Sequence, residues 1–230
     1  PEERRKFFDQ MLSLYSQRYF DALRSYGAIL AQRNAAIRSG DDYLISLYNN
    51  RLATYGMEIM EERAGAVYEF NKIFTPLFSR ISGTDFNLIV NYQPSWKEGG
   101  SVEEIESILV SSLERDKKMN TTTSGIHRDR FVVMSQYGPF SQIGSTGQLR
   151  LCSLIFRIAE ALYFSKMTGK KPILLLDDVL LELDSKKRGE VLSSLPDYSQ
   201  VWCTFLPDEN YHENSSLSLH FIVENGRLNG

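Results

Sequence analysis

The chain has 230 residues, of which 42% are hydrophobic and 24% charged, and a formal net charge of −3. This length and composition predict a globular protein with one large or two modest domains, and the net charge argues neither for nor against nucleic-acid binding. The longest apolar runs are too short to span a bilayer and no charged-then-apolar leader opens the chain, so we expect no membrane span. Both cysteines lie in apolar segments, so we expect them to be buried thiols in a reducing cytoplasm.

The first 80 residues are predicted to be mostly helical. Apolar residues recur at spacings of three and four over Phe8–Tyr26 and again over Leu44–Phe70, up to Pro76. Gly40 is a predicted C-cap, and Asp41 or Asp42 is predicted to begin the next helix. Two or three long helices folded back on one another would form a short antiparallel arm.

Residues 1–40 carry seven Lys and Arg against four Asp and Glu. One interpretation is an ordinary solvated helix face. The alternative is a surface that contacts the phosphate backbone of DNA, which needs no base-specific residues. The candidate DNA contacts on this surface are Arg18, Arg24, Arg33 and Arg38.

The middle of the chain alternates between strand and helix patterns. A strand is predicted over residues 86–92, a helix opens at Ser101 with Glu104 in a capping box, and a β pattern returns over residues 124–134. The last of these contains His127, which is more often a hydrogen-bonded structural residue than a catalyst. No second His or Cys lies at metal-ligand spacing, so a zinc site is not expected.

Ser145 and Gln148 fit a capping box at the start of a long amphipathic helix. Gly147 between them leaves a backbone amide uncovered in the first turn, and uncapped amides at a helix N-terminus can bind an anion such as a phosphate. A capping box that serves only its own helix is the alternative.

The run Ile173–Leu176 is continuously apolar and predicts a parallel strand buried on both faces. Asp177 and Asp178 then stand at its carboxyl end, where α/β sheets bind their ligands. One carboxylate there can hold Mg²⁺ through water and its neighbour can orient an attacking water, although solvated turns also follow strands. Asp184 is a predicted N-cap of the next helix, and another short buried strand is predicted over residues 201–205.

The capping box at Ser145–Gln148, followed by the apolar strand that ends in Asp177 and Asp178, resembles the signature motif and Walker B of the ABC-type ATPases. The chain resembles the RecF family of DNA replication and repair proteins over most of its length. The segments that carry the resemblance are S-T-G-Q-L-R, P-I-L-L-L-D-D-V-L-L-E-L-D and G-I-H-R-D. Ile126 and Arg130 depart from the family pattern, which has Pro and Asp there. The resemblance implies an α/β fold with a large helical part: a helical arm domain over residues 1–120 and the C-terminal lobe of an ABC-type (P-loop NTPase) head over residues 121–230.

The resemblance also implies a nucleotide site shared between two subunits, with ATP and Mg²⁺ as cofactors. The residues it assigns are Ser145, Gly147 and Gln148 for nucleotide binding in trans, Asp177 for Mg²⁺ through water, Asp178 for catalysis, and Asp184 and Thr204 for the D-loop and the γ-phosphate switch. The chain contains no G-x-x-x-x-G-K-[ST], so the Walker-A loop is expected in a missing N-terminal part. The chain alone is therefore not expected to hydrolyse ATP, and weak DNA-stimulated hydrolysis is expected of the intact protein.

A member of this family would be a cytoplasmic protein of recombinational repair and the SOS response. Its expected partners are single-stranded DNA, gapped duplexes and their junctions, a second copy in an ATP-dependent homodimer, RecR and RecO, and indirectly the recombinase RecA. A non-catalytic scaffold of an ABC-type protein is the alternative. A transporter ATPase subunit is less favoured, because transporters have His where this chain has Thr204 and lack the long helical region before the signature.

Overall fold

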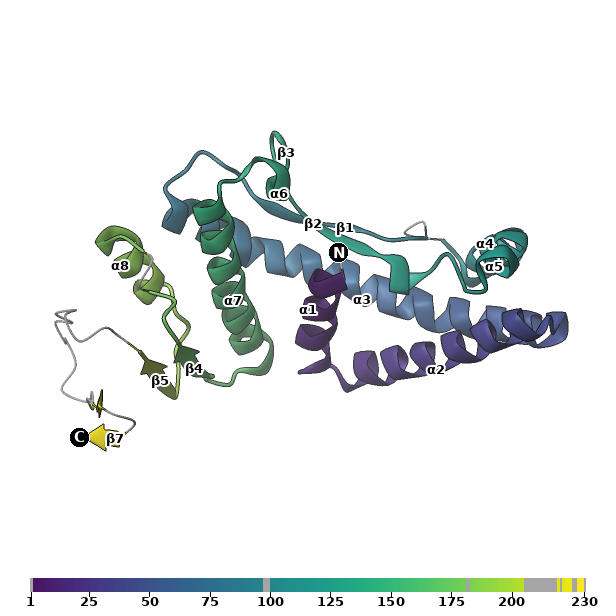
Figure 1. Ribbon diagram of the computed structural model, residues 1–230, viewed down its shortest axis with the longest axis horizontal. Coiled ribbons are helices and arrows are strands. Elements are labelled where there is room, and N and C mark those ends of the chain that lie inside the picture. Colours follow the sequence, from purple (N-terminus) through teal and green to yellow (C-terminus); the bar gives the residue numbers. More distant parts are fainter. Residues whose placement is uncertain are drawn as a thin grey trace.

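The computed structural model describes residues 2–96, 100–180, 183–204, 219, 221–224 and 227–229. Two long helices, α2 (Gln17–Ser39) and α3 (Asp42–Ser82), form an antiparallel hairpin that extends to one side of the molecule (Figure 1). The short helix α1 (Glu2–Ser13) precedes the hairpin, and α7 (Thr146–Thr168) packs across the other end of α3. Within the described ranges, none of the helices combines the length and apolar character needed to cross a bilayer.

The ends of the hairpin helices are fixed by neighbouring residues. Ser16 accepts a hydrogen bond from the Tyr19 amide at the start of α2, and Asp41 accepts one from the Leu44 amide at the start of α3. Gly40 ends α2 in the left-handed conformation, with φ 71° and ψ 24°. The predicted C-cap at Gly40 and the predicted helix start at Asp41 are confirmed.

The helix α3 does not end near Pro76, as the sequence pattern predicted, but continues to Ser82. Proline removes one backbone hydrogen bond from a helix interior and crowds the preceding turn. Here Phe74, Leu77 and Phe78 on either side of the proline are buried in the core. The free energy of burying these side chains, about 1.5–3 kcal/mol each, outweighs the cost of the proline.

An aromatic core joins α1, α3, α7 and the first sheet. Phe8 stacks on Phe131 with ring centroids 4.4 Å apart. Phe70 and Phe74 on α3 approach Phe156 on α7 at centroid distances of 5.0 and 4.8 Å. Aromatic pairs at these distances add about 0.5–1.5 kcal/mol each beyond the area that they bury. The cluster therefore fixes α7 against the hairpin.

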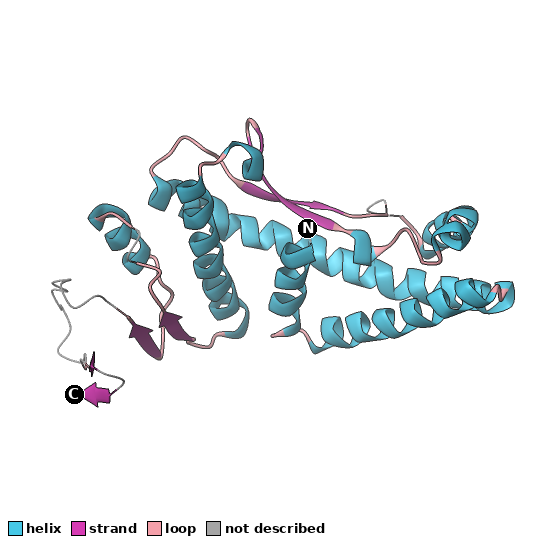
Figure 2. Ribbon diagram, viewed as in Figure 1, coloured by secondary structure: helices cyan, strands magenta, loops and turns pink. Residues whose placement is uncertain are grey.

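The first sheet is antiparallel and lies along α3 (Figure 2). Its strands are β1 (Ile89–Gln93), β2 (Arg130–Ser135) and β3 (Gly138–Pro139), in that order, with Tyr92 opposite Phe131. Between β1 and β2 lie α4 (Val102–Ser111), α5 (Leu113–Met119) and the 3₁₀ turn η1 (Ile126–Arg128), and α6 (Phe140–Ile143) follows β3. The predicted β segment over 124–134 becomes a strand only at Arg130, because residues 126–128 form this turn.

The second sheet consists of β4 (Ile173–Leu176) and β5 (Gln200–Cys203), which run parallel and are joined through α8 (Ser185–Ser193). A third pair, β6 (Ile222–Glu224) and β7 (Arg227–Asn229), is antiparallel. The strand predicted over residues 201–205 corresponds to β5, and Phe205 lies outside the described residues.

The prediction that residues 173–176 are buried on both faces is wrong for the described residues. Ile173 and Leu175 are 60% and 75% exposed, and Trp202 on β5 is 56% exposed. A parallel sheet normally has helices on both faces, and in the described part of the chain one face of this pair is uncovered. The strand lies where the apolar run predicts it, but its burial depends on the elements that cover it, and these are not encoded in the strand sequence.

Candidate functional site

The start of α7 has the predicted capping box. The Ser145 hydroxyl accepts a hydrogen bond from the Gln148 amide at 3.3 Å, and the Gln148 side-chain oxygen accepts one from the Ser145 amide at 2.8 Å. Ser145 is exposed and Gln148 is half-buried. The two residues thus stabilise their own helix, whether or not they also bind a ligand.

Packing against the described residues does not explain the glycine at position 147. It is exposed, and a Cβ atom added to it would meet nothing within 4 Å. The first turn of α7 is therefore an open helix N-terminus, where uncovered amides and the helix dipole favour an anion. The geometry leaves room for a phosphate or for another molecule to approach this turn closely.

The carboxyl end of β4 brings together three of the predicted site residues. The Thr204 hydroxyl lies 3.0 Å from Asp177 Oδ1 and 3.2 Å from Asp178 Oδ1, so it can donate to one carboxylate at a time. It also accepts a hydrogen bond from the Asp178 amide at 2.9 Å. Both carboxylates are exposed, and Asp178 has a left-handed backbone with φ 53°. The three side chains form an acidic, solvent-accessible cluster next to the last residue of the strand.

This acidic cluster does not meet the Ser145 turn within the chain. The 23 residues of α7 make a helix about 35 Å long, with Ser145 at its start. Figure 1 shows β4 near the C-terminal end of α7, away from the helix start. The open turn and the acidic cluster are therefore two separate groups of residues within one copy.

Asp184 is the N-cap of α8, as predicted. Its carboxylate accepts a hydrogen bond from the Lys187 amide at 2.9 Å and forms an ion pair with the Lys187 ammonium at 3.0 Å. These two interactions lower the pKa of Asp184 below its ordinary value. Its expected part in a D-loop stays a prediction.

The four candidate DNA contacts differ in exposure. Arg33 is completely buried, so the prediction that it lies on a DNA-binding surface is wrong. Its guanidinium bonds Asp116 and Thr122 at 2.8 Å each and Asn49 at 2.8 Å. Arg18 is exposed and paired with Glu58, whereas Arg24 and Arg38 are exposed without a described ion pair.

A second buried arginine, Arg63, was not singled out by sequence reasoning. It bonds Asp129 at 2.8 Å and Asp9 at 2.8 and 3.0 Å, and so ties α3 to α1 and to the loop before β2. Asp129 also accepts hydrogen bonds from the Tyr92 hydroxyl at 2.5 Å and the Ser95 amide at 2.7 Å. Burial raises the pKa of the Asp129 carboxyl, and Arg63 and these donors oppose the shift.

His127 has a structural environment. Its Nε2 lies 3.1 Å from the Thr122 carbonyl oxygen and its Nδ1 lies 2.9 Å from the Tyr26 hydroxyl, which fits a neutral ring that donates through Nε2. Burial lowers the pKa of His127 to about 4. In the described residues, no group of three His, Cys, Asp or Glu side chains is placed to hold a metal ion. A Mg²⁺ held by one carboxylate and by nucleotide phosphates needs no such group.

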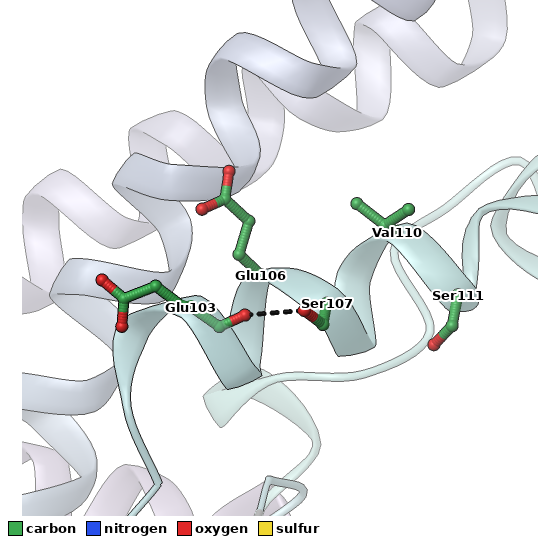
Figure 3. Close-up of a pocket in the computed structure, with 5 residues that line it drawn as sticks. All are labelled: Glu103, Glu106, Ser107, Val110 and Ser111. Carbon is green, nitrogen blue, oxygen red and sulfur yellow. Dashed lines mark hydrogen bonds between the residues drawn. The ribbon is translucent and has the colours of Figure 1, made fainter.

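An open hollow of about 430 Å³ lies along α4 (Figure 3). It is lined by Glu103, Glu106, Ser107, Val110 and Ser111, and the Ser107 hydroxyl donates to the Glu103 carbonyl at 2.8 Å. None of the predicted site residues lines it. Glu103 lies in the first turn of α4, where a carboxylate stabilises the helix dipole, so the acidic character has a local cause.

Comparison with known proteins identifies similar chains. The chain is 40% identical over 226 residues to the DNA replication and repair protein RecF of Treponema pallidum, which covers 97% of this chain and 64% of that protein. It is 32% identical over 202 residues to RecF of Herpetosiphon aurantiacus, covering 85% of this chain and 52% of that protein. The chain thus spans between about half and two thirds of these relatives. No protein-family model matches it.

Two solved structures share the fold. One is the recombination mediator protein RecF with ATP, from the RecFOR pathway, with a TM-score of 0.80, 27% identity and coverage of 89% of this chain and 58% of that one. The other is RecF with an ATP analogue, with the same TM-score, 26% identity and coverage of 99% and 62%. The predicted fold class, an α/β fold with a large helical part that includes part of an ABC-type head, is confirmed by these similarities.

Proposed function

The chain belongs to the RecF family of DNA replication and repair proteins, and on this premise we propose that it supplies the signature helix and the Walker-B strand of an ATP-binding head that dimerises with ATP and binds DNA. The similarity extends over 97% of the chain. A solved relative of the same fold is described with ATP, which supports ATP as the ligand here.

The observation that carries the proposal is the separation of the two groups of site residues. The open turn with Ser145 and Gly147 lies at the start of α7, whereas Asp177 and Asp178 follow β4, which comes after the C-terminal end of that helix. In a symmetric dimer each subunit presents its open turn to the nucleotide held by the partner, which makes two equal sites from one pair of surfaces. ATP then acts as part of the interface, and its hydrolysis weakens the dimer.

The end of β4 would handle the metal and the attacking water. Asp177 would hold Mg²⁺ through water, and Asp178 would orient the water that attacks the γ-phosphate. Thr204, whose hydroxyl contacts both carboxylates, would register whether a γ-phosphate is present. Hydrolysis is expected to be weak and stimulated by DNA.

The DNA ligands that we propose are single strands and gapped duplexes with their junctions, in the cytoplasm. The RecFOR pathway of the solved relative supports RecO and RecR as partners of this chain, and loading of RecA at gaps as the outcome. Nucleotide binding and DNA binding would then be coupled, because each would favour the dimer.

The sharpest test compares two capping boxes of the same chain. Ser145 on α7 and Ser101 on α4 both cap their helices through a residue three positions on, so Ser145→Arg and Ser101→Arg each remove a cap at a cost of about 1 kcal/mol. We expect Ser145→Arg to abolish ATP-driven dimerisation of the full-length protein while ATP binding by the monomer persists. Ser101→Arg should leave the dimer intact.

The measurement is sedimentation velocity with and without ATP and Mg²⁺. Wild-type dimerisation that persists in Ser145→Arg would contradict the shared site and leave the capping box as the role of Ser145.

A further inference from the structure

The loop that contains His127, Arg128 and Asp129 is held unusually firmly, and the function proposed above does not use it. His127 is bonded to the Tyr26 hydroxyl and to the Thr122 carbonyl. Asp129 is fully buried and is bonded by Arg63, Tyr92 and the Ser95 amide. Arg128 therefore projects from a backbone whose two neighbouring residues are fixed in place.

The turn before Arg128 is equally constrained. Gly125 has φ 128°, which side chains other than hydrogen rarely allow, and an added Cβ would lie 2.4 Å from the Tyr26 hydroxyl. The Arg128 amide donates to the Gly125 carbonyl at 2.8 Å, which closes the turn. A rigid backbone lowers the entropy that a side chain loses when it binds a ligand.

Two further arginines lie at the same loop. The Arg5 guanidinium donates to the Asp129 carbonyl oxygen at 3.4 Å, and Arg130 follows as the first residue of β2. Arg128 and Arg130 are both exposed, while Asp129 between them points into the core. We call Arg5, Arg128 and Arg130 the arginine triad.

The charges of the triad are not neutralised by the carboxylates next to it. Asp9 and Asp129 are paired with Arg63. Glu2 is paired with Lys6 at 3.0 Å. Among the ion pairs of the described residues, none includes a member of the triad. The exposed Arg128 and Arg130, with the half-buried Arg5 at the Asp129 carbonyl, therefore give this loop a net positive charge.

We infer that the arginine triad binds backbone phosphates of DNA at the junction of α1 with the first sheet. Guanidinium groups bond phosphate oxygens in a planar, two-pronged geometry, and a row of phosphates accepts several such cations where a single carboxylate accepts one. The inference rests on the proposed function for its ligand. The proposed DNA contacts are thus arginines that a duplex can reach, whereas Arg33 is buried.

The test measures the affinity of the full-length protein for a fluorescein-labelled gapped duplex between 50 and 200 mM salt. The variant is Arg128→Gln with Arg130→Gln, and Arg5 is left unchanged because it bonds the Asp129 carbonyl. A matched control, Arg51→Gln with Lys118→Gln, removes the same charge from exposed positions on α3 and α5. ATP-driven dimerisation of each variant verifies its fold.

We expect the triad variant to bind about tenfold more weakly for each arginine removed, because a charged hydrogen bond contributes about 1.5 kcal/mol. The slope of log affinity against log salt should fall by about 2, since each phosphate contact contributes about 0.9. The control should retain the wild-type slope.

Unchanged affinity and slope in the triad variant would overturn the inference and would point instead to a carboxylate-bearing protein partner for these arginines. Equal losses in variant and control would overturn it too, because net charge would then be the cause. A wild-type protein that does not bind the duplex would refute the DNA-binding part of the proposed function itself, and the inference with it.

Discussion

At the scale of single residues, two buried arginines connect parts of the chain that are far apart in sequence. Arg33 joins α2 to Asp116 and Thr122, more than 80 residues away, and Arg63 joins α3 to α1 and to Asp129. A buried ion pair contributes little over apolar packing while it is intact, but the loss of one partner leaves the other charge unpaired in the core.

The first prediction compares Arg33 with Arg38 on the same helix. Arg33→Ala should lower the free energy of unfolding by about 3–5 kcal/mol, because the buried Asp116 carboxylate loses its partner. Arg38→Ala, at an exposed position, should change it by no more than about 0.5 kcal/mol. Urea unfolding followed by circular dichroism gives both values. Equal effects of the two substitutions would contradict the buried pair.

The difference between these arginines could not be predicted from the sequence. Arg33 and Arg38 both occur in a basic helical segment, and only the fold shows that Arg33 faces Asp116 and Asn49. The structural role of His127 was predicted, because a lone histidine without metal-ligand neighbours is usually a hydrogen-bonded structural residue. Its hydrogen-bond partners, Tyr26 and Thr122, could not be predicted from the sequence, because they lie outside the turn that contains His127.

The second prediction concerns the free energy of unfolding at acidic pH. The folded pKa of His127, about 4, lies below the ordinary value of 6.5, so folding favours the neutral ring. The stabilisation is therefore complete above pH 6.5 and is lost as the pH falls from 6.5 to 4, by up to about 3 kcal/mol. In His127→Gln this part of the pH dependence should vanish. Unfolding free energies of both proteins at pH 7, 5.5 and 4.5 measure the difference, and parallel curves would argue against the neutral ring.

At the scale of helices and strands, the features that sequence reasoning located well are those set by nearby residues. The caps at Gly40, Asp41, Ser101 and Ser145 depend on hydrogen bonds that reach no more than four or five residues, and all four were predicted. The run of α3 through Pro76 and the exposure of β4 depend on packing with distant or additional elements. The sequence patterns at Pro76 and over residues 173–176 therefore predicted the end of α3 and the burial of β4 wrongly.

The third prediction uses Gly147 in the first turn of α7. Gly147→Ala should stabilise the fold by up to about 1 kcal/mol, since the added methyl group meets nothing and alanine favours the helix. The same methyl group should obstruct close approach of a partner's nucleotide and weaken ATP-driven dimerisation. Thermal unfolding and sedimentation of one preparation measure both effects. A variant that is more stable and dimerises normally would show that the glycine is not needed for contact in trans.

At the scale of the whole molecule, the proposed function makes ATP hydrolysis depend on a dimer, because the two groups of site residues lie apart within one copy. The fourth prediction is that Asp178→Asn in the full-length protein slows ATP hydrolysis by about 100-fold or more, because the attacking water loses its acceptor. Asparagine tolerates the left-handed backbone at this position, so the fold should be unaffected. The dimer should then accumulate in ATP.

Asp177→Asn is the contrasting variant. It removes the charge that would face Mg²⁺, so it should weaken nucleotide binding and with it the dimer. A hydrolysis assay and sedimentation in ATP distinguish the two. Hydrolysis by Asp178→Asn at the wild-type rate would show that this carboxylate does not orient the water.

Because α3 is one continuous helix from Asp42 to Ser82, a small rotation at one end of the hairpin produces a larger displacement at the other end. α7 packs against α3 at Phe70 and Phe74, about 45 Å along the helix from the hairpin tip at Asp42. A rotation of about 5° at this contact would therefore displace the tip by about 4 Å if the helix moves as one rod. The open turn with Ser145 belongs to α7 itself. A ligand that shifted α7 from that turn would therefore move the hairpin tip farther than it moved α7.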